Sequence, residues 1–202
     1  VTVAGLGSGS AKSLFLAALW QGLRRTIVLV TANDSSTESL AADIGYFHSA
    51  LNERHADCVS SFPAWDTDPY SGLSPHADIG RARARALWRL RSGETDIVAT
   101  SIRALGARLP RPTRFDSFGL HIALGDEVSQ ELMLDHLSTA GYVAQEPVGS
   151  VGEFSQRGGI VDVFSPLMAN PVRIEFFGDS VESIREFDPD DQRSTNPLRR
   201  ID

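Results

Sequence analysis

The chain has 202 residues, of which 42% are hydrophobic and 22% are charged. These fractions are typical of a globular protein with a buried core, and they exclude a disordered tail, a collagen-like fibre and a disulfide-rich mini-protein. The formal net charge is −7, which argues against nucleic-acid binding through clustered cations. The single cysteine, Cys58, has no partner for an internal disulfide, which favours a reducing cytoplasm. No apolar run approaches the roughly 18–20 residues of a membrane span.

The first half of the sequence alternates helix and strand signals. A glycine- and serine-rich loop at residues 5–12 comes first. The elements expected after it are a helix at 13–23, a buried parallel strand at 26–31, a helix that begins at a capping box of Ser35 and Glu38, a strand at 58–62, a helix from Ser74 and Pro75 to about Arg91, a buried strand at 96–100, and a short helix to 109. This order predicts a parallel sheet with helices on its faces.

The pattern changes after residue 117, from where strands predominate. The expected elements are a strand at 121–124, a helix between a Ser129 cap and a Gly141 stop, and strands at 142–145, 160–164, 172–177 and 181–187. Residues 1–117 hold 13 Lys and Arg against 11 Asp and Glu, a net charge of +2, and residues 118–202 hold 6 against 15, a net charge of −9. We therefore predict an α/β domain at 1–117 and a small α+β domain at 118–202. The chain begins at Val1, without Met, and we interpret it as a fragment of a longer protein.

The glycine-rich loop resembles a phosphate-binding loop. Lys12 and Ser13 match the ending of that motif, in which Lys contacts phosphates and Ser holds magnesium, and Gly9 supplies flexible backbone. Two positions depart from the motif, because Ala11 stands where a glycine is required and Leu6 stands six residues before the lysine. We expect a degenerate, inactive loop and no bound cofactor, although a working nucleotide site and an incidental anion site stay open.

Five arginines lie on the helix predicted at 75–91. Three of them, Arg81, Arg85 and Arg89, share one face, so they form either a solvated surface or a contact for phosphate or protein. Nearby, Asp66, Asp68, His76 and Asp78 match no closed metal-ligand spacing and are better explained as turn caps, so no metal site is expected. No nucleophile, acid or base forms a catalytic set, and we expect this fragment not to be an enzyme.

A hairpin over residues 171–188 carries the strongest physical signal. Alternation along 172–177 turns Val172, Ile174 and Phe176 inward and Arg173, Glu175 and Phe177 outward, and Gly178-Asp179 suits a two-residue turn. Upstream, Arg157 enters the strand at 160–164 through a Gly-Gly turn and can join the same patch. Exposed aromatic and arginine side chains are typical of binding hot spots. The alternative is that Phe177 folds back onto its own domain while the arginines pair with Glu175, Glu182 or Glu186.

Several longer segments, in order, resemble one known family. They are FPAWDTDPY at 62–70, LSPH at 73–76, GEFSQRGGIVDVF at 152–164, RIEFFGD at 173–179 and FDP at 187–189. Together they resemble the N-terminal, UvrB-like module of the bacterial transcription-repair coupling factors, the Mfd family. The resemblance covers nearly the whole chain.

The resemblance implies that residues 1 to about 117 are the first part of a helicase-like α/β domain of the P-loop type. It implies that residues from about 118 to 197 bind UvrA, through Arg157, Arg173 and Phe177. The parent protein would be an ATP-dependent DNA translocase that contacts RNA polymerase and DNA through its other parts and masks the UvrA-binding surface. The segment between Phe62 and Leu73 is too short for the aromatic hairpin with which UvrB clamps damaged DNA.

The function expected from the sequence is therefore that of an adaptor. It would bind UvrA and recruit nucleotide excision repair to stalled RNA polymerase in the cytoplasm. Two alternatives remain open: a P-loop ATPase fragment that uses Lys12 and Ser13, and a DNA-binding module that uses the helix from Arg81 to Arg91.

Overall fold

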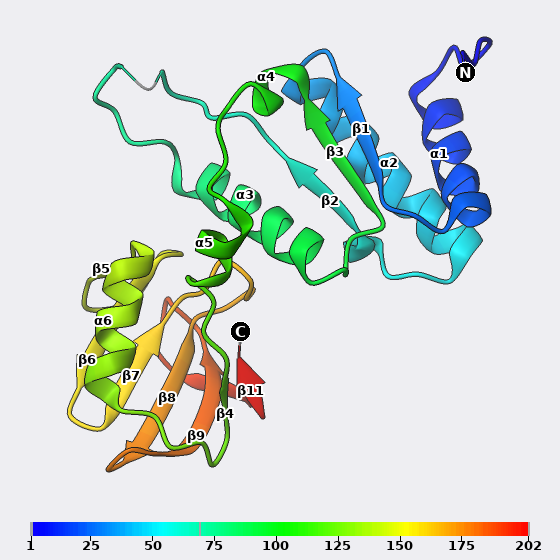
Figure 1. Ribbon diagram of the computed structural model, residues 1–202. Coiled ribbons are helices and arrows are strands. Elements are labelled where there is room, and N and C mark those ends of the chain that lie inside the picture. Colours follow the sequence, from blue (N-terminus) through cyan, green and yellow to red (C-terminus); the bar gives the residue numbers. More distant parts are fainter. Residues whose placement is uncertain (1, 69, 202) are drawn as a thin grey trace. The chain divides into compact units, whose positions relative to one another are not determined.

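The computed structural model describes residues 2–68 and 70–201, so Pro69 of the motif at 62–70 lies outside the described residues. The chain forms two compact units, one that ends at Arg108 and one that starts at Leu109 (Figure 1). The sequence placed this boundary after residue 117. The short helix α5 (Pro112–Asp116) lies in the second of the two compact units.

The first unit is built on a three-stranded parallel sheet. Its strands are β1 (Ile27–Thr31), β2 (Val59–Phe62) and β3 (Ile97–Ser101), in the order β1-β3-β2. Its helices are α1 (Gly9–Leu23), α2 (Asp34–Asn52), α3 (Ala77–Arg91) and α4 (Ile102–Leu105), with a 3₁₀ turn η1 at Ala56–Cys58. The predicted parallel sheet is confirmed.

Helices cover both faces of this sheet, as the alternating pattern predicted. On one face, Trp20 of α1 and Ile44 of α2 pack with Ile97 of β3. On the other face, Ala86 of α3 packs with Phe62 of β2 and other residues of the sheet. Cys58 is buried among these elements, as expected of a small core residue.

The prediction that the strand at 26–31 is buried on both faces is wrong. Burial alternates along β1, and Val28 and Val30 are 54% and 45% exposed. The reason is position: β1 is the edge strand of the sheet, and α3 packs against β2 rather than over β1. A run of β-branched residues therefore identified a strand here, but not its degree of burial.

Three predicted helix starts are also wrong, although the helices themselves are present. Helix α1 begins at Gly9 rather than at 13, because the Ser8 hydroxyl accepts a hydrogen bond from the Ala11 amide at 3.1 Å. Helix α2 is capped by Asn33, two residues before the expected Ser35. Helix α3 starts at Ala77, after an N-cap at His76.

The second unit contains a six-stranded sheet in the order β10-β9-β8-β7-β6-β5, antiparallel except for the β5–β6 pair. The strands β6 (Glu153–Arg157), β10 (Ser194–Pro197) and β11 (Arg200–Ile201) were not predicted. The others are β4 (Ile122–Ala123), β5 (Val143–Ala144), β7 (Ile160–Val163), β8 (Val172–Phe177) and β9 (Ser180–Phe187), and β4 pairs with β11.

Helix α6 (Gln130–Ala140) covers one face of this sheet (Figure 1). The predicted Ser129 cap and Gly141 stop are confirmed. Met133 and Leu137 of α6 pack on inward residues of β6 to β9, among them Val161 and Ile174. The opposite face of the sheet carries the residues that the sequence analysis singled out.

Within the described residues, no helix combines the length and the apolar character that crossing a bilayer requires.

Candidate partner-binding site

The hairpin β8–β9 presents its side chains as predicted. Val172, Ile174 and Phe176 of β8 are buried, whereas Phe177 is 82% exposed. The two-residue turn is Gly178-Asp179, and Gly178 has a φ of 62°, a conformation that glycine adopts without strain. A register shift near Glu175 places the extra residue on β9, so the alternation along β8 is intact.

The Gly158-Gly159 turn brings Arg157 to the same sheet. A Cβ atom on Gly159 would lie 2.8 Å from the carbonyl oxygen of Phe176, so only glycine fits where this turn passes β8. At that point the Phe176 amide donates to the Gly159 carbonyl at 2.7 Å. The close approach ties the β6–β7 turn to the end of β8 that carries Phe177.

The strand register places the three predicted site residues on one face. Arg157 lies opposite Ile160, and Ile160 lies opposite Glu175, so these side chains share a side of the sheet. Arg173 is two residues before Glu175 on β8, and Phe177 is two residues after it, which keeps both on that side. From strand geometry, Phe177 is about 7 Å along the strand and about 10 Å across it from the row of Arg157.

A buried carboxylate joins the two arginines. Asp162, whose side chain is 1% exposed, accepts from Arg173 Nε at 2.7 Å and Nη2 at 2.8 Å, and from Arg157 Nη2 at 2.9 Å. The hydrogen bond to Asp162 raises the pKa of the Arg173 guanidinium above its ordinary value, although partial burial opposes the shift. Asp162, rather than the three glutamates of the alternative interpretation, is therefore the common partner of the two arginines.

The three side chains differ in accessibility. Arg157 is 48% exposed and also faces Glu146, whose Oε1 is 3.5 Å from its Nε. Arg173 is only 16% exposed, because its guanidinium lies 4.8 Å from the ring centroid of Phe187 and donates to the Gln192 carbonyl as well as to Asp162. Phe177 and Arg157 therefore provide most of the solvent-accessible surface of the site, whereas Arg173 exposes only an edge of its guanidinium group.

Asp162 is a part of this site that was not predicted from the sequence. The sequence does contain a clue to its role, because an aspartate within the apolar strand IVDV needs a partner that offsets the desolvation of its carboxylate. The register of β6, β7 and β8 decides which cations reach Asp162, and a local sequence pattern does not reveal that register.

The glycine-rich loop has a different geometry from a phosphate cradle. Residues 2–8 contain no strand, and the helix has already begun at Gly9. Lys12 is exposed, whereas Ser13 is fully buried, so its hydroxyl is not accessible to a solvent-borne ion. A helix that has already begun at Gly9 and a fully buried Ser13 both depart from the exposed loop that the motif describes.

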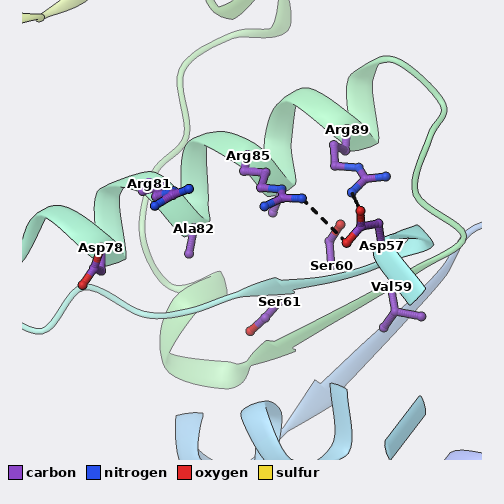
Figure 2. Close-up of a pocket in the computed structure, with 10 residues that line it drawn as sticks. Asp57, Val59, Ser60, Ser61, Asp78, Arg81, Ala82, Arg85 and Arg89 are labelled. Atoms are coloured by element: carbon purple, nitrogen blue, oxygen red, sulfur yellow. Dashed lines mark ion pairs between the residues drawn. The ribbon is translucent and has the colours of Figure 1, made fainter. Parts of the chain in front are cut away.

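The arginine-rich helix α3 has two distinct faces. Arg83 is buried, lies 4.0 Å from the ring centroid of Phe62 and 4.4 Å from that of Trp65, and donates to the Pro63 carbonyl. Burial lowers its pKa from the ordinary value. Arg81, Arg85 and Arg89 line a surface pocket instead, which Figure 2 shows in close-up.

The acidic loop before α3 acts as a set of turn caps, as predicted. The Asp66 carboxylate accepts from the His76 amide at 3.3 Å, and Asp68 accepts from the Tyr70 amide at 2.8 Å. No group of three or more metal-ligating side chains occurs in the part of the chain that the structure describes.

Comparison with known proteins shows a domain family that the second unit resembles. Residues 120–202 match the family model of the UvrB interaction domain. This segment comprises the six-stranded sheet, α6 and the Asp162 cluster.

The whole chain is similar to transcription-repair-coupling factors. It is 35% identical to that of Myxococcus xanthus over 96% of this chain, 37% identical to that of Haemophilus influenzae over 75%, and 33% identical to that of Bacillus subtilis over 98%. The chain spans 16%, 13% and 16% of the length of these relatives. The resemblance to the coupling-factor family expected from the sequence is confirmed.

Proposed function

We propose that this chain is the UvrA-binding adaptor part of a transcription-repair coupling factor. The observation that carries the proposal is the 82% exposed ring of Phe177, on the same sheet face as the Arg157–Asp162–Arg173 cluster of a UvrB interaction domain. In this role it recruits nucleotide excision repair to stalled RNA polymerase, and the rest of the parent protein contacts polymerase and DNA.

The physical basis is that of a hot spot. When a partner pocket covers the exposed Phe177 ring, removal of its apolar surface from water stabilises the complex by about 25 cal/mol per Å². Arg157 is already oriented by Asp162 and Glu146, so little side-chain entropy is lost when it pairs with an acidic group of UvrA. Arg173 presents one guanidinium edge and keeps Asp162 in place.

The first unit takes a supporting role in this proposal. Its three parallel strands and flanking helices fit the first part of a helicase-like α/β domain, which the remaining length of the parent would complete. The buried Ser13 and the capped start of α1 favour a loop that does not hydrolyse nucleotide.

Binding to purified UvrA tests the proposal. Phe177→Ala should weaken binding by at least about 2 kcal/mol, or roughly 30-fold in Kd, and Arg157→Ala by a smaller factor. Phe177→Ala should leave the free energy of unfolding nearly unchanged, because the ring is exposed. Arg157→Ala should lower it by about 1–3 kcal/mol, because it removes a hydrogen bond from the buried Asp162 carboxylate, so its binding is compared at a temperature where both variants are folded.

Two variants in the first unit control for non-specific loss of an aromatic ring or a cation. Tyr46→Ala removes an exposed ring, and Arg25→Ala removes an exposed cation. Neither should alter Kd. Equal weakening by Phe177→Ala and Tyr46→Ala, or full binding by Phe177→Ala, would contradict the proposal.

A further inference from the structure

A second polar site lies in the first unit, on the surface between α3 and β2 (Figure 2). It is a pocket of about 340 Å³, within the size range of small-molecule sites. Its polar lining comes from successive turns of α3, from β2 and from η1: Arg81, Arg85, Arg89, Asp78, Ser60, Ser61 and Asp57. Figure 2 shows Arg85 and Arg89 directed toward Asp57.

The ion pairs inside this pocket are loose. Arg85 Nη2 is 3.7 Å from Asp57 Oδ1, and Arg89 Nη1 is 3.8 Å from Asp57 Oδ2. On its other side, away from the pocket lining, Arg89 Nε is 3.7 Å from Glu94 Oε2. All three distances exceed hydrogen-bond length. Asp57 therefore holds neither guanidinium group at hydrogen-bond distance, and an anion in the pocket could accept from both.

Asp57 indicates what kind of group suits this position. Its carboxylate lies between the two guanidinium groups, so an oxyanion suits the position electrostatically. One carboxylate anchored on η1 reaches neither arginine at hydrogen-bond distance. A phosphoryl group has three terminal oxygens and a charge of about −1.5 to −2, and it can accept from two guanidinium groups at once.

We propose that Arg85 and Arg89, with Arg81 beside them, form a phosphoryl-binding pocket, in which Asp57 takes the place of the anion when no ligand is present. Guanidinium groups one helical turn apart, about 6 Å along the axis, can take the same phosphoryl group from two sides. Asp57 has a side chain that is 63% exposed, so it can move toward solvent when the ligand enters. The ligand class is a small phosphate ester or inorganic phosphate.

The proposal makes Asp57 a competitor of the ligand, and this gives a distinctive test. The ¹⁵N-labelled chain is titrated with inorganic phosphate at pH 7.5 and low salt, while the Nε–Hε signals of the arginines are followed by NMR. The Arg85 and Arg89 signals should shift and saturate. Arg89→Gln should weaken phosphate binding at least 10-fold, and Asp57→Asn should tighten it severalfold.

The control variant is Arg25→Gln, which removes the same charge from an exposed position of the same unit. It should leave the phosphate affinity unchanged. Equal weakening by Arg25→Gln and Arg89→Gln, or no tightening by Asp57→Asn, overturns the proposal. Because the Asp57 variant is expected to gain affinity, misfolding cannot imitate the expected result.

Parallel titrations with AMP and with a short single-stranded oligonucleotide distinguish the sources of the phosphoryl group. Affinity for AMP above that for inorganic phosphate assigns the pocket to a small phosphate ester. Equal affinities assign it to the phosphate ion. Arg89-dependent binding of the oligonucleotide alone, without binding of either small ligand, overturns the small-ligand proposal.

Discussion

Two adjacent phenylalanines on β8 have different roles, since one packs in the core and the other is exposed to solvent. Phe176 is 9% exposed and belongs to the main core of the second unit, whereas Phe177 is 82% exposed. The two side chains are chemically identical, so the difference follows from strand alternation alone.

The first prediction compares these two residues. Phe176→Ala should lower the free energy of unfolding by about 3–5 kcal/mol, because it leaves a cavity in the core. Phe177→Ala should change it by less than about 0.5 kcal/mol. Urea denaturation followed by circular dichroism measures both, and similar losses for the two variants would show that the Phe177 ring is packed.

The second prediction concerns Asp162. Asp162→Ala should lower the free energy of unfolding by about 3–5 kcal/mol, because it leaves the largely covered Arg173 without its bidentate partner. Glu146→Ala is the matched control, since its pair with Arg157 is exposed and worth at most about 1 kcal/mol. If thermal unfolding shows equal losses for both variants, Asp162 does not organise the cluster.

A third prediction concerns alkaline pH. Burial raises the pKa of the Tyr142 phenol above its ordinary value of about 10, although a hydrogen bond with Ser165 opposes the shift. The unfolded chain therefore loses this proton first, so the stability due to Tyr142 is complete below about pH 10 and falls as the pH rises toward the folded-state value.

Urea midpoints at pH 8 and pH 11 measure this effect. Tyr142→Phe should lose less stability between the two pH values than the unaltered chain. Tyr46→Phe serves as the control, because Tyr46 is 71% exposed. The assignment to Tyr142 fails if both variants behave like the unaltered chain.

Alternation predicted the outward direction of Phe177 from the sequence alone. It also placed Arg173 outward, but it could not show that Arg173 is mostly covered. The groups that cover it are Asp162, Phe187 and Gln192, which come from three other parts of the chain. Contacts between distant segments have no signature in a local pattern.

At the scale of elements, the bodies of helices and strands were predictable and their ends were not. A hydrophobic stripe of several turns identifies a helix, but one side-chain hydrogen bond decides its start, as Asn33 does for α2. Strand β6 was missed because its sequence, EFSQR, is too polar to alternate clearly. It is held in the sheet by its pairing with β7.

The fourth prediction concerns the turn between β6 and β7. Gly159→Ala should destabilise the second unit by about 1–3 kcal/mol, because the new methyl group would press on the Phe176 carbonyl. Gly149→Ala should be nearly neutral, since no atom lies within 4 Å of its added Cβ. Equal melting temperatures for the two variants would contradict the close approach at Gly159.

At the scale of the whole molecule, the two compact units differ in charge and in architecture. The sequence showed both differences, through the excess of acidic residues after residue 117 and through the change from alternating helices and strands to strands. The exact boundary was not predictable, because α5 carries no pattern that links it to the sheet that follows. In our account, partner recognition depends on one face of the second unit.

Site-specific photo-crosslinking tests this central claim most directly. A photoreactive benzoylphenylalanine replaces Phe177 in the full chain, and in a control chain it replaces Tyr46, which is similarly exposed in the first unit. After irradiation with purified UvrA, the account predicts a covalent adduct from position 177 and none from position 46. If the chain binds UvrA but no adduct forms from position 177, the account is contradicted.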